Sequence, residues 1–154
     1  MKRVMRVAMV AGGLVAATCT AQMGPMPGMH GAMMGGSPVR RTFVMRYGVD
    51  PKYARMTNPL PPTRANADAG RRLYSLNCVA CHGERGYGDG PAAGSLNPPA
   101  AKLVGIGGMP MVGDGYLFWT IADGGRPLGT AMPAYKGILG RSDIWKIVLF
   151  LRTL

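Results

Sequence analysis

Two cysteines and a histidine lie close together in the middle of the chain, as Cys78-Val79-Ala80-Cys81-His82. Two thiols at this spacing can reach the two vinyl groups of one haem, while the adjacent imidazole turns towards the iron. The pattern therefore predicts one covalently attached haem c, bound through Cys78 and Cys81, with His82 as a ligand of the iron.

A Cys-x-x-Cys pair has two other common uses. A thiol–disulfide redox motif expects a strand and a helix of thioredoxin type around it, and a zinc site needs two more ligands. The chain has one further cysteine, Cys19, and one further histidine, His30, both near the N-terminus, and no strand pattern precedes Cys78. Haem attachment is the interpretation that remains.

The second axial ligand of haem iron in electron carriers is often a methionine thioether. Met132 lies fifty residues after His82, whereas Met109 and Met111 lie much nearer to it. For any methionine the alternative is simple gap-filling in a core. The spacing favours Met132, because a chain that covers one face of a haem needs the helix predicted at 115–123 before it can return to the other face. Met109, Met111 and an open sixth position are the alternatives.

Three segments have apolar residues at helical spacing and begin near a capping residue. The predicted helices are 67–77 after Asn66, 115–123 after Asp114 and 143–152 after Ser142. Long loops rich in glycine and proline connect them, and no pair of alternating apolar runs predicts a sheet. With aromatic residues at 7% the core is thin, so a bound group is expected to fill it. The predicted fold class is all-α.

The region 66–154 resembles a class I, monohaem c-type cytochrome. The residues that carry the resemblance are Gly70, Tyr74, the cysteine motif with Gly83, the loop at 86–91, Asn97-Pro98-Pro99, Met132-Pro133 and the closing segment 145–152. The resemblance implies a small cytochrome c fold whose loops wrap one haem, with the first and last helices crossing near Gly70 and Tyr74. It also implies that the carbonyl of Pro98 or Pro99 accepts a hydrogen bond from the His82 ring.

The N-terminus has the features of a secretory signal peptide over residues 1–21. Lys2, Arg3 and Arg6 precede an apolar run at 7–18, which is shorter than the roughly 20 residues that a spanning helix needs. We therefore expect export, most simply to the periplasm, and cleavage after Ala21. Acylation of Cys19, as in a lipoprotein, is the alternative.

Two further segments precede the predicted cytochrome domain at 66–154. Residues 22–39 are rich in Met, Gly and Pro and are predicted to be disordered, and residues 40–65 are predicted to form an extended arm. Met23, Met26, Met29 and His30 offer soft ligands that could bind Cu(I). A flexible tail without a metal is the alternative interpretation.

Without the three basic residues of the signal peptide, the chain has 15 Lys or Arg and 7 Asp or Glu, a net charge of +8 that favours acidic partners or an anionic membrane surface. Nucleic acid is not expected, because an exported chain rarely meets it and the sequence has no dense basic run with interleaved aromatics. Five basic residues are candidates for a docking surface around the haem edge: Arg71, Arg72, Lys102, Lys136 and Lys146.

These features predict one-electron transfer in an exported respiratory or dehydrogenase-linked chain, with His82 and Met132 as iron ligands and with no catalytic residues. Two alternatives stay open. One is a haem subunit that docks on a larger membrane oxidoreductase complex through residues 40–62. The other is a sensor or peroxidase-like protein with an open iron site.

Overall fold

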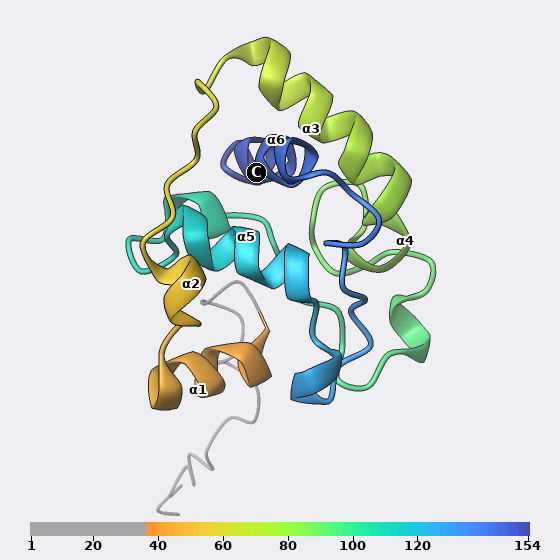
Figure 1. Cartoon of the computed structure of the whole chain (residues 1–154). Coiled ribbons are helices and arrows are strands. Elements are labelled where there is room, and N and C mark those ends of the chain that lie inside the picture. The colour runs from red at the N-terminus through yellow and green to blue at the C-terminus, as the bar shows by residue number, and fades with distance from the viewer. Residues whose placement is uncertain (1–36) are drawn as a thin grey trace, which may run out of the picture.

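The computed structural model describes residues 37–154. Within this part of the chain the regular structure is helical and no strand forms, which confirms the all-α fold class (Figure 1). None of the helices described is long and apolar enough to span a bilayer. The predicted signal peptide, Cys19 and the proposed Cu(I) ligands at 23–30 lie outside the described residues.

Three helices build the body of the molecule, as predicted: α3 (Arg64–Asn77), α5 (Asp114–Asp123) and α6 (Arg141–Leu151). Each begins earlier than expected. The cap of α3 is Thr63 rather than Asn66, because the Thr63 hydroxyl accepts a hydrogen bond from the Asn66 backbone N–H at 3.3 Å. A short helix, α4 (Val79–His82), and three single turns complete the body: η1 (Ala93–Ser95), η2 (Ile106–Gly108) and η3 (Arg126–Leu128).

Helices α3 and α6 cross in close contact (Figure 1). Gly70 lies at the crossing, where a Cβ atom would stand 1.9 Å from the Lys146 carbonyl oxygen. One turn further along α3, Tyr74 is 1% exposed and its ring centroid lies 5.1 Å from that of Phe150. The crossing at Gly70 and Tyr74 that the resemblance implied is therefore present.

Helix α5 packs against α6 on the other side of the core. The rings of Phe118 and Trp145 are 4.3 Å apart between centroids, tilted by 40°. The apolar residues of both helices are almost fully buried. Because α5 and α6 are apolar around most of their surface, they are enclosed by the loops and by the N-terminal segment.

The N-terminal segment differs from the predicted extended arm, because it contains two helices. They are α1 (Pro38–Tyr47) and α2 (Pro51–Ala54). Ser37 and Asp50 cap them, and a proline occupies the first turn of each, where its missing N–H costs no hydrogen bond. Residues 37–39, predicted to be disordered, thus belong to a helix and its cap.

The arm packs against the body and does not project from it. Tyr53 is 6% exposed and belongs to the core. The backbone of α5 approaches it closely at Gly115, where a Cβ atom would lie 2.0 Å from the Tyr53 carbonyl oxygen. Asn58 then donates from its side chain to the Trp145 carbonyl at 2.9 Å and from its backbone to Asp114 at 3.0 Å. The compact body therefore begins well before residue 66.

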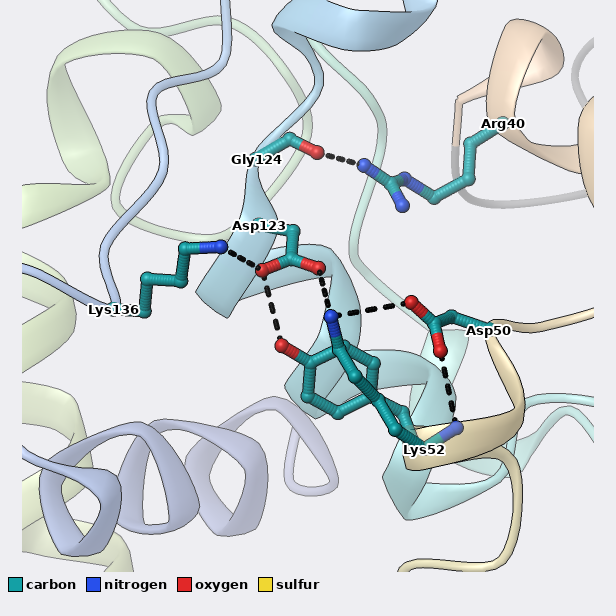
Figure 2. A network of polar contacts seen from close by, with 7 residues as sticks. Arg40, Asp50, Lys52, Asp123, Gly124 and Lys136 are labelled. Atoms are coloured by element: carbon teal, nitrogen blue, oxygen red, sulfur yellow. Dashed lines mark hydrogen bonds and ion pairs between the residues drawn. The ribbon is translucent and has the colours of Figure 1, made fainter.

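A polar network fastens α2 to the end of α5 (Figure 2). Asp123 accepts hydrogen bonds from the Tyr53 hydroxyl and the Lys136 ammonium group, both at 3.0 Å, and lies 3.6 Å from the Lys52 ammonium group. Lys52 also pairs with Asp50 at 3.2 Å. Burial alone would raise the pKa of Asp123, but the hydrogen bonds and the nearby positive charges outweigh burial and lower it.

We predict that Gly70→Ala destabilises the protein. Alanine gains about 1 kcal/mol of helix propensity over glycine, but its methyl group would force α3 away from the Lys146 carbonyl, and overpacking costs typically 1–3 kcal/mol or more. Urea unfolding should show a net loss of stability. Gly94→Ala is the control, because a Cβ there meets open space. Equal loss in both variants would contradict a tight crossing.

We predict that Asp123→Asn costs about 1 kcal/mol at neutral pH, through weaker hydrogen bonds and a lost ion pair. The folded-state pKa of Asp123 is depressed, so its contribution is present above the unfolded value of about 3.9 and is lost as pH falls through the folded value. Urea unfolding between about pH 7 and pH 3 should show the two proteins converging at acidic pH.

Asp68→Asn is the matched control for this pH series. Asp68 is 51% exposed and pairs with Arg64 at 3.7 Å on the surface of α3, so its removal should change stability by less than about 0.5 kcal/mol. A gap between wild type and Asp123→Asn that stays constant down to the lowest pH would contradict the depressed pKa of Asp123.

Candidate functional site

A mainly apolar cavity lies between α3, α5, α6 and the two long loops. It has about 1100 Å³ of empty space, counting the part open to solvent. Its walls include Leu117 and Ile121 from α5 and Ile147 and Leu151 from α6. All four residues predicted for the site also line it: Cys78, Cys81, His82 and Met132.

The cysteine pair lies where α3 ends and α4 begins. The Cys78 N–H donates to the Tyr74 carbonyl at 2.8 Å, so the motif continues directly from the helix that crosses α6. Both thiols are free and half-buried. Burial, followed by the neighbouring Cys81, raises the pKa of Cys78 to about 12. A reactive redox thiol needs a depressed pKa, so this environment does not fit a thiol–disulfide motif of thioredoxin type.

The His82 ring is oriented by a backbone carbonyl. Its Nδ1 lies 2.9 Å from the carbonyl oxygen of Ala101. A carbonyl can only accept, so Nδ1 carries the proton and Nε2 keeps a lone pair. Burial lowers the pKa of His82 and so favours the neutral imidazole, and the hydrogen bond to Ala101 opposes this shift only in part. The acceptor is thus Ala101 and not Pro98 or Pro99, although all three residues line the cavity.

The loop that carries Met132 is tied back onto the end of α5. The Met132 carbonyl accepts from the Gly125 N–H at 2.9 Å, and the Tyr135 N–H donates to the Ile121 carbonyl at 3.1 Å. Gly124 permits this return, because its φ is +66° and a Cβ there would lie 2.4 Å from the Pro133 carbonyl oxygen. These backbone contacts hold Met132 in the cavity wall, half-buried.

Tyr135 connects the Met132 loop to the cysteine motif. Its hydroxyl donates to the carbonyl of Asn77, directly before Cys78, at 2.6 Å. Burial, followed by the two cysteines, raises the pKa of Tyr135 to about 12, so the hydroxyl remains a donor at physiological pH. One hydrogen bond thus links segments separated by 58 positions in sequence.

The alternative methionines do not reach the cavity lining. Met109 packs against the core, and Met111 is 93% exposed. Two residues that matter at the site were not anticipated from the sequence. Ala101 acts through its carbonyl, which has no sequence signature, and Arg40 lines the cavity from α1, outside the region that the resemblance covered.

Comparison with protein families places the molecule among the monohaem c-type cytochromes. Residues 65–151 match the family described as cytochrome c oxidase, cbb3-type, subunit III. The match spans more than half of the chain, so the chain belongs to this family of cytochrome c domains. No curated protein sequence matches it.

Comparison with solved structures finds a similar chain in the reducing HAO-like protein complex of Kuenenia stuttgartiensis. The two chains share 25% sequence identity with a TM-score of 0.50. The similarity covers 62% of the present chain and 46% of the other, so the present chain spans less than half of that relative.

Membership of this family implies a covalent haem c, and the residues lining the cavity fit that group. Two free thiols, an imidazole whose Nδ1 is hydrogen-bonded and a thioether share one mainly apolar enclosure. Thiols are the groups that form thioethers with haem vinyls, and imidazole and thioether are established ligands of haem iron. An apolar wall suits the porphyrin faces.

We predict that Tyr74→Phe destabilises the protein by about 1–3 kcal/mol, because a buried acceptor loses its partner. The Tyr74 hydroxyl donates to the Gly83 carbonyl at 2.7 Å, next to His82, and phenylalanine would keep the ring packing against Phe150. Chemical unfolding measures the effect. The control is Tyr87→Phe, at a residue that is 48% exposed. Indistinguishable midpoints for the two variants would show that the buried hydrogen bond contributes nothing.

Proposed function

We propose that this protein is a one-electron carrier in which haem c is attached through Cys78 and Cys81 and its iron is held by His82 and Met132. The observation that carries the proposal is that these four side chains line one apolar cavity, although Met132 is fifty residues from His82. When bound, the haem supplies a one-electron couple between ferric and ferrous iron.

The residues of the chain bind the group, fix its orientation and keep water away. Ala101 holds the imidazole of His82 in one tautomer, which presents Nε2 to the cavity. The contacts of Gly125 and Tyr135 hold the Met132 loop against α5 and against the cysteine motif. Among the described residues of the lining there is no carboxylate to act as a general acid or base, which favours electron transfer over catalysis.

We further propose that the chain functions after export. Haem attachment would then take place in the compartment to which the chain is exported, which is expected to be the periplasm. Cleavage after Ala21 would leave a mature chain without Cys19, whereas the lipoprotein alternative would retain Cys19 as an anchor. The mass of the mature protein separates these two forms, because they differ in their first residue and in an attached lipid.

The partner is proposed to be a redox protein with an acidic docking surface. Residues 37–154 contain 15 Lys or Arg and 7 Asp or Glu, so the charge excess lies on the described body. Of the five candidate docking residues, Lys136 forms an ion pair with Asp123 and Lys146 forms one with Asp143. The relative from Kuenenia stuttgartiensis is part of a protein complex, which supports docking on a larger assembly as a second form of the same function.

The test is Met132→Ala in the ferric protein. Wild type should show the weak far-red absorption band of a thioether–iron bond, and the variant should lose it because no other methionine lines the described cavity. Intact mass should report one covalent haem in both proteins. Met109→Ala is the control and should keep the band, since Met109 packs against the core away from the lining.

The possible outcomes distinguish the alternatives. If the band survives in Met132→Ala and disappears in Met109→Ala, the ligand assignment is wrong. If wild type lacks the band and binds exogenous ligands at once, the protein has an open iron site and belongs with sensors or peroxidase-like proteins. If the mass shows no haem, the proposed function itself fails.

A further inference from the structure

The arm places a buried arginine in the wall of the cavity. Arg40 lies on α1, which precedes the family match at residues 65–151. The residue is 3% exposed, and it lines the same cavity as Cys78, His82 and Met132. A fully buried arginine is rare without a partner for its charge, because desolvation of a charged group is costly.

The protein fixes the guanidinium group of Arg40 but leaves part of it unsatisfied. Its Nη2 donates to the Gly124 carbonyl (Figure 2). Its Cζ stands 4.4 Å from the centroid of the Trp119 ring. Its Nη1 is buried and has no hydrogen-bond partner in the described part of the chain. The side chain is thus held in one orientation, with a donor free for another group.

No carboxylate within the described residues forms an ion pair with Arg40. Asp123 influences Arg40 only through space and is itself engaged by Lys52, Tyr53 and Lys136. Arginine stays protonated in proteins, so the positive charge persists in this buried position. An anion in the cavity is the simplest partner for it.

The surroundings of Arg40 form a polar region in an otherwise apolar cavity. Ser37 and Tyr116 line the cavity with Arg40, and the Ser37 hydroxyl accepts from the Arg40 N–H at 3.5 Å. Thr130 also lines the cavity, and its hydroxyl lies against Gly125, next to the Gly124 carbonyl that Arg40 binds. These groups suit a carboxylate, which accepts several hydrogen bonds at once.

We infer that Nη1 of Arg40 donates to a propionate carboxylate of the haem, so that the arm closes over the cofactor and is held there by an ion pair. This inference rests on the proposed function, because haem is the group that brings two carboxylates into this cavity. The proposed contact is a hydrogen-bonded ion pair, and no covalent bond is made or broken. The positive charge of Arg40 neutralises the carboxylate and favours the ferrous state.

The test compares Arg40→Met and Arg40→Lys with Arg46→Met, an exposed arginine on the same helix. Two measurements are made on holoprotein: the reduction potential, and the haem carboxylate bands in the redox-induced infrared difference spectrum. Arg40→Met should lower the potential and shift the carboxylate bands, because an unpaired carboxylate stabilises ferric iron. Arg40→Lys should keep most of the reduction potential, because the positive charge is retained. It should still shift the carboxylate bands, because an ammonium group forms different hydrogen bonds from a planar guanidinium group.

Several outcomes would overturn the inference while leaving the proposed function intact. If all variants hold one covalent haem and Arg40→Met matches Arg46→Met in potential and bands, Arg40 does not contact the propionate. If the effect of Arg40→Met appears only in phosphate buffer and not in a buffer without phosphate, the partner is a free anion. If Arg40→Met does not fold, unchanged carboxylate bands in Arg40→Lys would overturn the inference. Absence of haem from wild type would instead contradict the proposed function.

Discussion

The close crossing of α3 and α6 at Gly70 is the contact on which the site depends. The Lys146 carbonyl occupies the space where a side chain would stand, so the two helices approach as closely as their backbones permit. Tyr74, one turn later, packs on Phe150 and donates to the Gly83 carbonyl. The crossing therefore determines the direction in which α3 delivers the cysteine motif, and it places His82 at the edge of the cavity.

The other half of the site is positioned by hydrogen bonds together with apolar packing of Met132 and Tyr135 against the core. The loop after α5 returns through Gly124, and the Met132 carbonyl is bound by Gly125. The Tyr135 hydroxyl then donates a hydrogen bond to the Asn77 carbonyl oxygen at 2.6 Å. Each contact is local and modest, of the order of 1 kcal/mol, but together they leave the loop few alternative paths. A thioether on a flexible loop would be a poor ligand, because it would lose conformational freedom on binding.

The arm changes how the domain is enclosed. Helices α1 and α2 are both capped and pack over α5, with Tyr53 in the core. Asp123, at the end of α5, accepts a hydrogen bond from the Tyr53 hydroxyl of α2. The family match begins at residue 65, so both helices precede it. The segment that the sequence suggested as a docking arm for another protein is thus used, in this molecule, on its own body. The excess of positive charge is shared between the two parts, because residues 37–62 hold 5 basic and 1 acidic residue and residues 63–154 hold 10 and 6.

The sequence by itself determined the chemistry of the site and the class of fold. Thiol spacing, an adjacent imidazole and helical periodicity are local properties, so the cysteine motif and three helices could be predicted from neighbouring residues. The caps were misplaced, since Thr63 and Asn66 are both good capping residues and only the backbone geometry distinguishes them. Tertiary structure alone decided that Ala101 and not a proline orients His82, and that Arg40 enters the cavity wall. Both outcomes depend on how segments far apart in sequence pack together, and a carbonyl or an arginine carries no local signal of that packing.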